Sequence, residues 1–319
     1  MKIFLYLISF IIICIAPFLG EITLSLNDIF DSSNSASMIF WDLRVSRVLL
    51  AFFVGGILAL GGLIFQIIFK NELITPYTLG IASGTTLFTA IAIVFFPMLN
   101  ISISSVFGSI VTILILYFIS KRINQNSVAV STNSILLIGI SLSYFYGSAL
   151  MLVFYMSNLQ ENYSIIRFTL GSLDTVGFSN SFIIMCLSAV FYTIIHLNKQ
   201  KIKLLLICND TAFLKGLNVN KTNLILLIVV SLSVGISISF VGPIGFIGLI
   251  IPHIIKLIYK QSADKLFFPV FFFGGIFLVF SDLISRNLNT DSSLPIGVVT
   301  AFIGAPFFVY LLIRRNKKV

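Results

Sequence analysis

RVSRVLLAFFVGGILALGGLIFQIIFK, residues 44–70, is the stretch that decides the fold. Between Arg47 and Lys70 it runs for 22 residues without a charged side chain. A helix of about 20 apolar residues crosses the roughly 30 Å of hydrocarbon in a bilayer. The rest of the chain has the same character, since 58% of its 319 residues are hydrophobic and only 10% are charged. A soluble domain cannot hide that much apolar surface, so the chain is predicted to be an integral membrane protein.

Ten apolar runs of this kind follow one another along the chain. They cover residues 3–20, 48–69, 77–99, 103–119, 135–156, 180–197, 222–241, 244–258, 266–284 and 295–313. The alternating apolar and polar stretches typical of membrane β-barrels are absent, and helices are the other structure that satisfies all backbone groups in lipid. We predict an all-α membrane protein of about ten transmembrane helices, one domain over residues 1–319, with residues 1–20 as an uncleaved first span.

The basic residues are divided unequally between the two sides of the membrane. With ten spans, sixteen of the 20 lysines and arginines, including every lysine, fall on the side of the two chain ends. The other side carries Arg44, Arg47, Arg167 and Arg286, together with eight of the 11 acidic residues. Cytoplasmic loops are enriched in lysine and arginine, so both termini are predicted to be cytoplasmic. The same rule explains the net charge of +9 without a nucleic-acid partner.

Two stretches do not fit plain spans. Residues 158–179 are too polar to cross, and we expect outer-face helices or a partly re-entrant turn there. Residues 239–253 hold three glycines and Pro243 close together. Such helix breakers are tolerated at membrane depth where protein or a cavity covers the freed backbone groups. Two short, kinked spans are therefore predicted in this region.

Motifs of common enzyme sites are missing from the sequence. There is no H-E-x-x-H, C-x-x-C or G-x-S-x-G, and the three cysteines are widely spaced. A G-x-x-x-x-G-K-S/T loop, which cradles ATP phosphates, is absent too. Ion-coupled carriers bury charges at mid-membrane, whereas here Asp282, near the outer end of its run, is the nearest candidate. No enzyme activity, metal or cofactor is expected, and an ion-driven mechanism is disfavoured.

Gly139, Ser143 and Gly147 lie four residues apart and share one face of the helix predicted at 135–156. Small residues at this spacing let membrane helices pack closely. A face that lines a wide path is the alternative. Both interpretations, path and packing, stay open.

Four segments resemble one family in their order and spacing. They are residues 44–84, ICNDTAFLKGLNV at 207–219, VGPIGFIGLIIPHIIKLI at 241–258, and residues 281–312. They are similar to the membrane subunits of binding-protein-dependent ABC importers for iron–siderophore, haem and cobalamin, the FecCD/BtuC type. The resemblance covers nearly the whole chain.

The resemblance implies a permease of BtuC-like fold in the bacterial cytoplasmic membrane. Subunits of that family have ten spans and pair as homodimers or close heterodimers. Two cytoplasmic ATPase subunits drive them, and a substrate-binding protein docks outside. An iron–siderophore complex is the expected cargo, with haem and cobalamin as alternatives. From another class, an ion-coupled secondary transporter is the alternative, and it needs a buried charge that the spans lack.

The resemblance also implies a segment that couples the chain to the ATPase, whose family pattern is G-D/E-x-A-x-x-L-G. The matching residues are Asn209, Asp210, Thr211, Ala212, Phe213, Leu214, Lys215 and Gly216. Asp210 and Ala212 fit the pattern, whereas Asn209 replaces a glycine and Lys215 a leucine. A short helix here is expected to carry the power stroke, and an ordinary solvated basic loop is the alternative.

Arg44, Arg47 and Arg286 match family arginines that pair with glutamates of the docked binding protein. Arginine keeps its charge and offers a planar fork to a carboxylate, and ion pairs at a rim steer docking more than they add affinity. The alternative is that these arginines pair with the chain's own acids, Asp42 or Asp282.

Three further positions carry weaker implications. Ser131 and Thr132 match a short loop that narrows the inner end of the path in the family, and a cap for the following helix is the alternative. Pro252 and His253 match a family Pro-His pair, for which a buried structural role is expected. Arg167 has no clear family match and is left as a structural residue.

Overall fold

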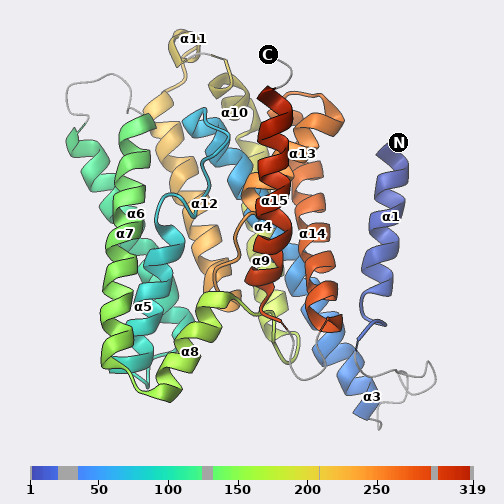
Figure 1. The fold of residues 1–319 in the computed structure, drawn as a ribbon. Helices are drawn as coiled ribbons and strands as arrows, with labels where there is room; N and C mark the ends of the chain where they lie inside the picture. Colours follow the sequence, from blue (N-terminus) through green and yellow to red (C-terminus); the bar gives the residue numbers. More distant parts are fainter. Residues whose placement is uncertain (1, 21–34, 124–131, 208, 289–293, 317–319) are drawn as a thin grey trace.

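Helices make up the regular structure of the chain (Figure 1). The computed structural model describes residues 2–20, 35–123, 132–207, 209–288 and 294–316. Its helices are α1 (Lys2–Ile15), α3 (Ser35–Met38), η1 (Ile39–Val45), α4 (Ser46–Phe69), α5 (Ile81–Phe95), α6 (Ile101–Ile123), α7 (Thr132–Met156), α8 (Leu159–Leu170), α9 (Ser179–Leu197), α10 (Lys199–Leu205), α11 (Asn209–Leu214), α12 (Val219–Val241), α13 (Ile247–Tyr259), η2 (Ala263–Lys265), α14 (Phe267–Asn287) and α15 (Ile296–Asn316). The described residues contain no strand, and the predicted all-α class is confirmed.

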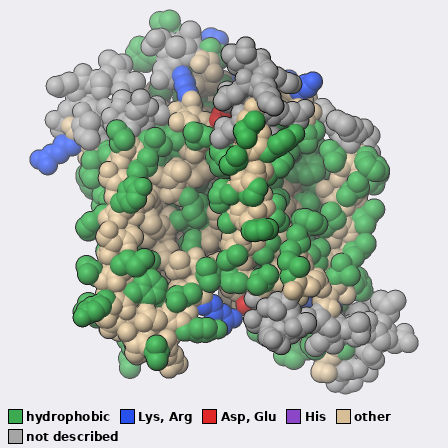
Figure 2. Space-filling model, in the orientation of Figure 1, with side chains coloured by type: hydrophobic (Ala, Val, Ile, Leu, Met, Phe, Trp, Pro, Cys, Tyr) green, Lys and Arg blue, Asp and Glu red, His purple; other side chains and the backbone are tan. Residues whose placement is uncertain are grey.

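Six helical stretches of the described residues are long and apolar enough to cross a membrane. They are Ser35–Phe69, which joins α3, η1 and α4, and the helices α6, α7, α9, α12 and α14. Four shorter apolar helices, α1, α5, α13 and α15, occupy the other predicted runs. Each of the ten runs thus holds an apolar helix, while the number of crossings stays a prediction. Figure 2 shows hydrophobic side chains over the flank of the visible face and lysine or arginine toward its two ends.

Helix α4 is enclosed by the bundle because it is apolar on every side. Leu50, Ile57, Leu63 and Phe65 are fully buried. A helix that is hydrophobic all round is stable where neighbours cover all its faces, and α9, α12, α13 and α14 pack against α4. The π-helix η1 continues α4 outward. The outer arginines of this region therefore lie on a helix and not in a loop.

Glycines let α4 approach two neighbours at backbone distance. A Cβ at Gly55 would overlap the carbonyl oxygen of Gly274 on α14, and a Cβ at Gly62 would overlap that of Gly248 on α13. Contacts between small residues give membrane helices close van der Waals packing. Helices α4, α13 and α14 therefore form a tightly packed core, which frames the arginines at one end and the polar ends of α4 and α13 at the other.

Residues 239–253 differ from the predicted pair of short, kinked spans. Helix α12 keeps 23 residues, and only α13 is short, with 13 residues. Gly242 follows α12 with a φ of +71°, and a Cβ there would overlap the carbonyl oxygen of Phe168. Glycine is the residue that tolerates such a conformation and such a close approach. The prediction is wrong for α12 because every breaker in this stretch lies after its last residue, Val241.

The polar stretch 158–179 contains α8, so the predicted helix is present there, while its place on the outer face stays a prediction. The Asn158 side chain accepts a hydrogen bond from the Glu161 N–H at 2.9 Å, and the Glu161 carboxylate accepts one from the Asn158 N–H at 2.9 Å. This capping box satisfies two end donors of the helix. Figure 1 places α3 and α8 at one end of the bundle, and α11 with the last turns of α15 at the other. Which end faces the cytoplasm stays a prediction from the charge distribution, and α3 and α8 mark the end called outer below.

Candidate outer docking site and inner coupling helix

Three helices bring the predicted docking arginines together. Arg44 lies in η1, Arg47 in the first turn of α4, and Arg286 in the last turn of α14. The packing of α14 on α4 places Arg286 beside the other two. Arg44 is 7% exposed and Arg286 8%, and the Arg47 side chain is 13% exposed. The chain itself therefore encloses most of each arginine.

Asp282 of α14 is the carboxylate that two of these arginines share. Arg47 donates from Nε to Asp282 Oδ1 at 2.7 Å, and Arg286 Nε lies 3.1 Å from Asp282 Oδ2. The Asp282 side chain is fully buried, and a buried charge is stable only when it is paired. Asp42 and Asp282 were the two acids proposed as internal partners of the arginines. Of these, Asp282 pairs with both Arg47 and Arg286. The spans do contain a buried charge, near their outer end, but it is neutralised by arginine.

The buried arginines also hold the turn that follows α1. Arg44 Nη1 donates to the carbonyl oxygens of Pro17 at 3.3 Å and Phe18 at 3.4 Å. Arg286 Nη2 donates to the carbonyl oxygen of Ala16 at 3.1 Å. Charged donors make stronger hydrogen bonds than neutral ones. Both arginines therefore fix the end of the first helix, a contact that no local pattern in the sequence indicates.

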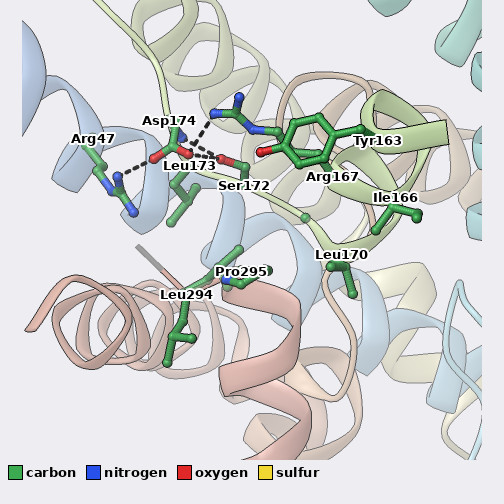
Figure 3. Close-up of a pocket in the computed structure, with 12 residues that line it drawn as sticks. Arg47, Tyr163, Ile166, Arg167, Leu170, Ser172, Leu173, Asp174, Leu294 and Pro295 are labelled. Atoms are coloured by element: carbon green, nitrogen blue, oxygen red, sulfur yellow. Dashed lines mark hydrogen bonds and ion pairs between the residues drawn. The ribbon is translucent and has the colours of Figure 1, made fainter. Parts of the chain in front are cut away.

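An open pocket of about 290 Å³ lies beside Arg47 (Figure 3). Helix α8, the loop after it, and the residues that lead into α15 form its walls. Its lining consists of Arg47, Tyr163, Ile166, Arg167, Leu170, Gly171, Ser172, Leu173, Asp174, Leu294, Pro295 and Ile296. Figure 3 shows Asp174 between the guanidinium groups of Arg47 and Arg167. The pocket therefore combines apolar walls with a line of charges along one edge.

Asp174 bridges the two arginines of the pocket. Its Oδ1 lies 2.5 Å from Arg47 Nη1, and its Oδ2 accepts from Arg167 Nη2 at 3.2 Å and from Ser172 Oγ at 2.6 Å. Burial raises the pKa of Asp174, but the Ser172 hydrogen bond and the charges of Arg47 and Arg167 together lower it by more. The pKa of Asp174 therefore lies below its usual value. Asp174 is therefore ionised at neutral pH, and it ties α8 to α4.

Sequence patterns do not identify Asp174, Ser172 or a partner for Arg167. Arg167, Ser172 and Asp174 all lie within residues 158–179, the stretch recognised as too polar to cross. The polarity of this stretch was the sequence signal that could have pointed to them. The Arg167 side chain is 60% exposed. It is thus the most exposed of the four outer arginines, whereas the three matched to the family are the more buried ones.

At the other end of the bundle, residues 209–216 form α11 and its cap. The Leu217 N–H bonds to the Ala212 carbonyl at 3.0 Å, and the Gly216 N–H to the Phe213 carbonyl at 2.8 Å. With Gly216 at a φ of +80°, these two bonds make a Schellman cap. Ala212 and Leu217 are both buried, and a hydrophobic contact between these two positions often accompanies such a cap, while Phe213 is 67% exposed and Leu214 83%. The segment is thus an anchored short helix with an apolar tip, and not an unstructured loop. The side chains of residues 209–211 lie outside the described part.

The predicted gate and the small-residue face of α7 are described only in part. Ser131 lies outside the described residues, and Thr132 is the first residue of α7. A Cβ at Gly139 would stand 2.6 Å from the Cα of Leu79, so this position packs against the turn before α5. The Ser143 hydroxyl donates to the Gly139 carbonyl at 2.9 Å. No atom of the described residues lies within 4 Å of a Cβ built at Gly147. The face is therefore packed at Gly139 and open at Gly147.

A polar link joins α13 to the inner end of α4. Lys256 Nζ donates to Gln66 Oε1 at 2.9 Å, and Gln66 Nε2 donates to the Gly248 carbonyl at 3.2 Å. His253 Nδ1 lies 3.9 Å from Glu72 Oε2, with 17% of the histidine side chain exposed. No group of three His, Cys, Asp or Glu side chains in the described residues is placed to hold a metal ion.

The structure is thus a membrane-type bundle of apolar helices, with a charged pocket at one end and an anchored helix with an apolar tip at the other. The chain belongs to the FecCD transport family, whose family model matches residues 7–314. Its homologues are permease subunits of ABC transporters, which are not enzymes themselves.

Relatives of known name cover most of the chain. It is 32% identical over 283 residues, 89% of this chain and 85% of the relative, to the "Probable iron chelatin transport system permease protein" of Helicobacter pylori. It is 28% identical to the vitamin B12 import system permease protein BtuC of Vibrio cholerae, over 96% of this chain and 92% of the relative. It is 29% identical to the hemin transport system permease protein HmuU of Yersinia pestis, over 94% and 91%.

The fold is similar to that of a solved metal-chelate type ABC transporter in an inward-facing conformation. The TM-score is 0.87 at 25% identity, and the match covers 97% of each chain. The chain is thus a multi-pass ABC importer permease of the FecCD/BtuC family in the bacterial inner membrane.

Proposed function

We propose that this permease translocates an iron–siderophore complex, powered by separate ATPase subunits and supplied by an outer substrate-binding protein. The relative named for iron chelatin transport supports this cargo. Relatives named for hemin and vitamin B12 keep haem and cobalamin as alternatives within the family. An ion-coupled mechanism is not supported, because the buried charge at Asp282 is bound by two arginines.

Helix α11 is the observation that carries the proposal. Its tip exposes Phe213 and Leu214, while its base is buried through Ala212 and Leu217. Exposed apolar side chains held on a rigid element are typical of protein contact sites. Residues 209–216 therefore serve as the contact with the ATPase, and the rigid cap lets the contact transmit force to α12.

A second permease copy, identical or paralogous, completes the path. Helices α7 and α15 expose large apolar side chains, among them Tyr144 at 76% and Phe302 at 82%. The open position at Gly147 belongs to the same helix as Tyr144. In this proposal α7 and α15 face the partner copy across the path, and Ser131 and Thr132 narrow its inner end.

The outer arginines divide their work in this proposal. Arg47 borders the pocket and is partly exposed, so it contacts the binding protein. Arg44 and Arg286 are buried and hold the end of α1. They support docking by fixing the structure around Arg47.

Uptake in cells tests the function directly. Cells that lack this chain should lose uptake of a radiolabelled iron–siderophore complex and regain it on complementation, while haem and cobalamin uptake should not change. The paired substitution Phe213→Ser and Leu214→Ser should abolish the regained uptake and the co-purification of the ATPase. Leu159→Ser is the matched control, because Leu159 is 90% exposed at the outer end of the bundle. Full uptake by the α11 double variant would refute the coupling assignment.

A further inference from the structure

Five charged side chains form a continuous ladder at the outer end of the bundle. Their order is Arg167, Asp174, Arg47, Asp282 and Arg286, and each contacts the next. The exposed fraction of these side chains falls from 60% at Arg167 through 35% and 13% to 0% at Asp282, with 9% at Arg286. The ladder thus leads from the surface of α8 into the packed core of α4 and α14.

The ladder holds three cations and two anions, so it carries one unit of positive charge in excess. Among the residues that the structure describes, the buried Arg286 Nη1 at the inner end of the ladder has no hydrogen-bond partner. At the outer end, Arg167 shares one carboxylate oxygen with Ser172 and projects toward solvent. The ladder is therefore complementary to one additional carboxylate, and only its outer end is accessible.

Asp174 is held in place by more than its ion pairs. The Asp174 N–H donates to Ser172 Oγ at 3.0 Å, and that hydroxyl donates to Asp174 Oδ2 at 2.6 Å. The Ser172 N–H donates to the Val241 carbonyl at 2.8 Å, and the Ile296 N–H donates to the Gly171 carbonyl at 3.2 Å. The loop after α8 is thus tied to α12 and α15, and these contacts hold the Asp174 carboxylate between the guanidinium groups of Arg47 and Arg167.

The outer and inner ion pairs of the ladder differ in how easily one charged partner can be replaced by another. Exposed ion pairs contribute little, because water and salt screen them. Removing one partner of a buried pair leaves an uncompensated charge. The contact between Arg167 and Asp174 is therefore exchangeable, whereas the contact between Arg47 and Asp282 is permanent.

We propose that Asp174 is an internal substitute for an acidic side chain of the docked binding protein. In the undocked chain Asp174 occupies Arg47 and Arg167. On docking, a glutamate or aspartate of the binding protein enters the pocket and pairs with Arg167, which gives this arginine a role in recognition. This inference rests on the proposed function, since it names the outer partner's contact.

The pocket suits a single acidic side chain. Its volume of about 290 Å³ lies at the lower limit of the roughly 300–1,000 Å³ typical of small-molecule sites. Tyr163, Ile166, Leu170 and Pro295 give it apolar walls, and an ion pair is stronger beside such walls than in open water. Size and charge therefore favour a protein carboxylate over the whole anionic chelate, which is the alternative occupant to be tested.

The test measures association of the substrate-binding protein that supports uptake by this permease with the purified permease–ATPase complex in nanodiscs, over a salt series. Arg167→Gln should slow association about tenfold and flatten its salt dependence, because steering by a rim charge acts on the association rate. Asp174→Asn should tighten binding about threefold or more, because the internal competitor is removed. Arg122→Gln, an exposed arginine at the end of α6, should change neither value.

The double variant, Arg167→Gln with Asp174→Asn, distinguishes competition for Arg167 from a general effect of charge on binding. If Asp174 competes for Arg167, the gain from Asp174→Asn should shrink markedly when Arg167 is already glutamine, so the two effects are not additive. Ser172→Ala should give a smaller gain of the same sign, and it provides the answer if Asp174→Asn does not fold.

Three results would overturn the inference. The first is weaker or unchanged binding for both Asp174→Asn and Ser172→Ala. The second is strict additivity in the double variant. The third is loss of direct chelate binding in Arg167→Gln with binding-protein association unchanged, which would make the pocket a cargo site. Each of these leaves the importer function intact, whereas a wild-type complex that binds no binding protein would contradict the proposed function itself.

Discussion

Asp282 is the side chain whose loss should disturb this fold most clearly. The substitution Asp282→Asn keeps the volume of the side chain and removes its charge. Of the partners that the structure describes, Arg286, whose side chain is 9% exposed, would then keep the Ala16 carbonyl but no carboxylate, while Arg47 would keep Asp174. Removing one partner of a buried ion pair is destabilising by roughly 3–5 kcal/mol. Because one of the two arginines retains a carboxylate, we expect the lower end, about 3 kcal/mol.

Unfolding by SDS in mixed micelles measures this loss, with helix content as the signal. Asp174→Asn is the comparison, since its side chain is 35% exposed and surface ion pairs contribute about 0–1 kcal/mol. Adding Arg286→Met to Asp282→Asn removes the orphaned charge and should recover most of the stability. The buried-pair reasoning is refuted if Asp282→Asn lowers the free energy of unfolding by no more than Asp174→Asn does.

Three further predictions concern single positions. Gly62→Ala should lower the free energy of unfolding by about 1–3 kcal/mol in the same assay, because its Cβ overlaps the Gly248 carbonyl. Gly147→Ala should be neutral, because a Cβ there meets no atom of the described residues within 4 Å. Gly216→Ala should destabilise the cap of α11 by roughly 1–2 kcal/mol, since its φ is +80°. More ATP should then be hydrolysed for each cargo molecule transported. An unchanged ratio of ATP hydrolysed to cargo transported would contradict a coupling role. Despite burial, the pKa of Asp174 lies below its usual value because of the Ser172 hydrogen bond and the charges of Arg47 and Arg167, so its contribution to stability is full above the usual value and is lost as the pH falls through the lowered pKa. Stability lost between neutral pH and about pH 5 would therefore have another source.

Much of the fold could be predicted because hydropathy is a local property of the chain. An apolar run long enough to cross a bilayer becomes a helix whatever its neighbours are, and helices stand at all ten runs. The missed detail was α12, which keeps its full length because Gly242 and the other breakers lie after its last residue, Val241. The close approach of Gly242 to the Phe168 carbonyl joins segments more than seventy residues apart, and no local pattern predicts it.

The candidate site could be predicted only in its residue types. Arginine at the outer end was evident, and Asp282 was one of two candidate internal partners. The bridge from Arg47 to Asp174 spans 127 positions in the chain, and the pair of Arg47 with Asp282 spans 235. Charge signs alone cannot choose among eight outer acids, because the choice depends on which helix ends come within a few ångströms.

The sequence by itself determined that this chain is a helical membrane protein, where its apolar helices lie, and which family it resembles, because these follow from composition, run length and ordered motifs. Only the tertiary structure decided that Arg44 and Arg286 are buried, that Asp174 joins Arg47 to Arg167, and that α11 presents Phe213 and Leu214 on a fixed base. The physical reason is the sequence separation over which each property is set. Whether a run of residues suits lipid depends on the side chains of that run alone, whereas an ion pair requires two side chains from distant segments to meet within about 4 Å.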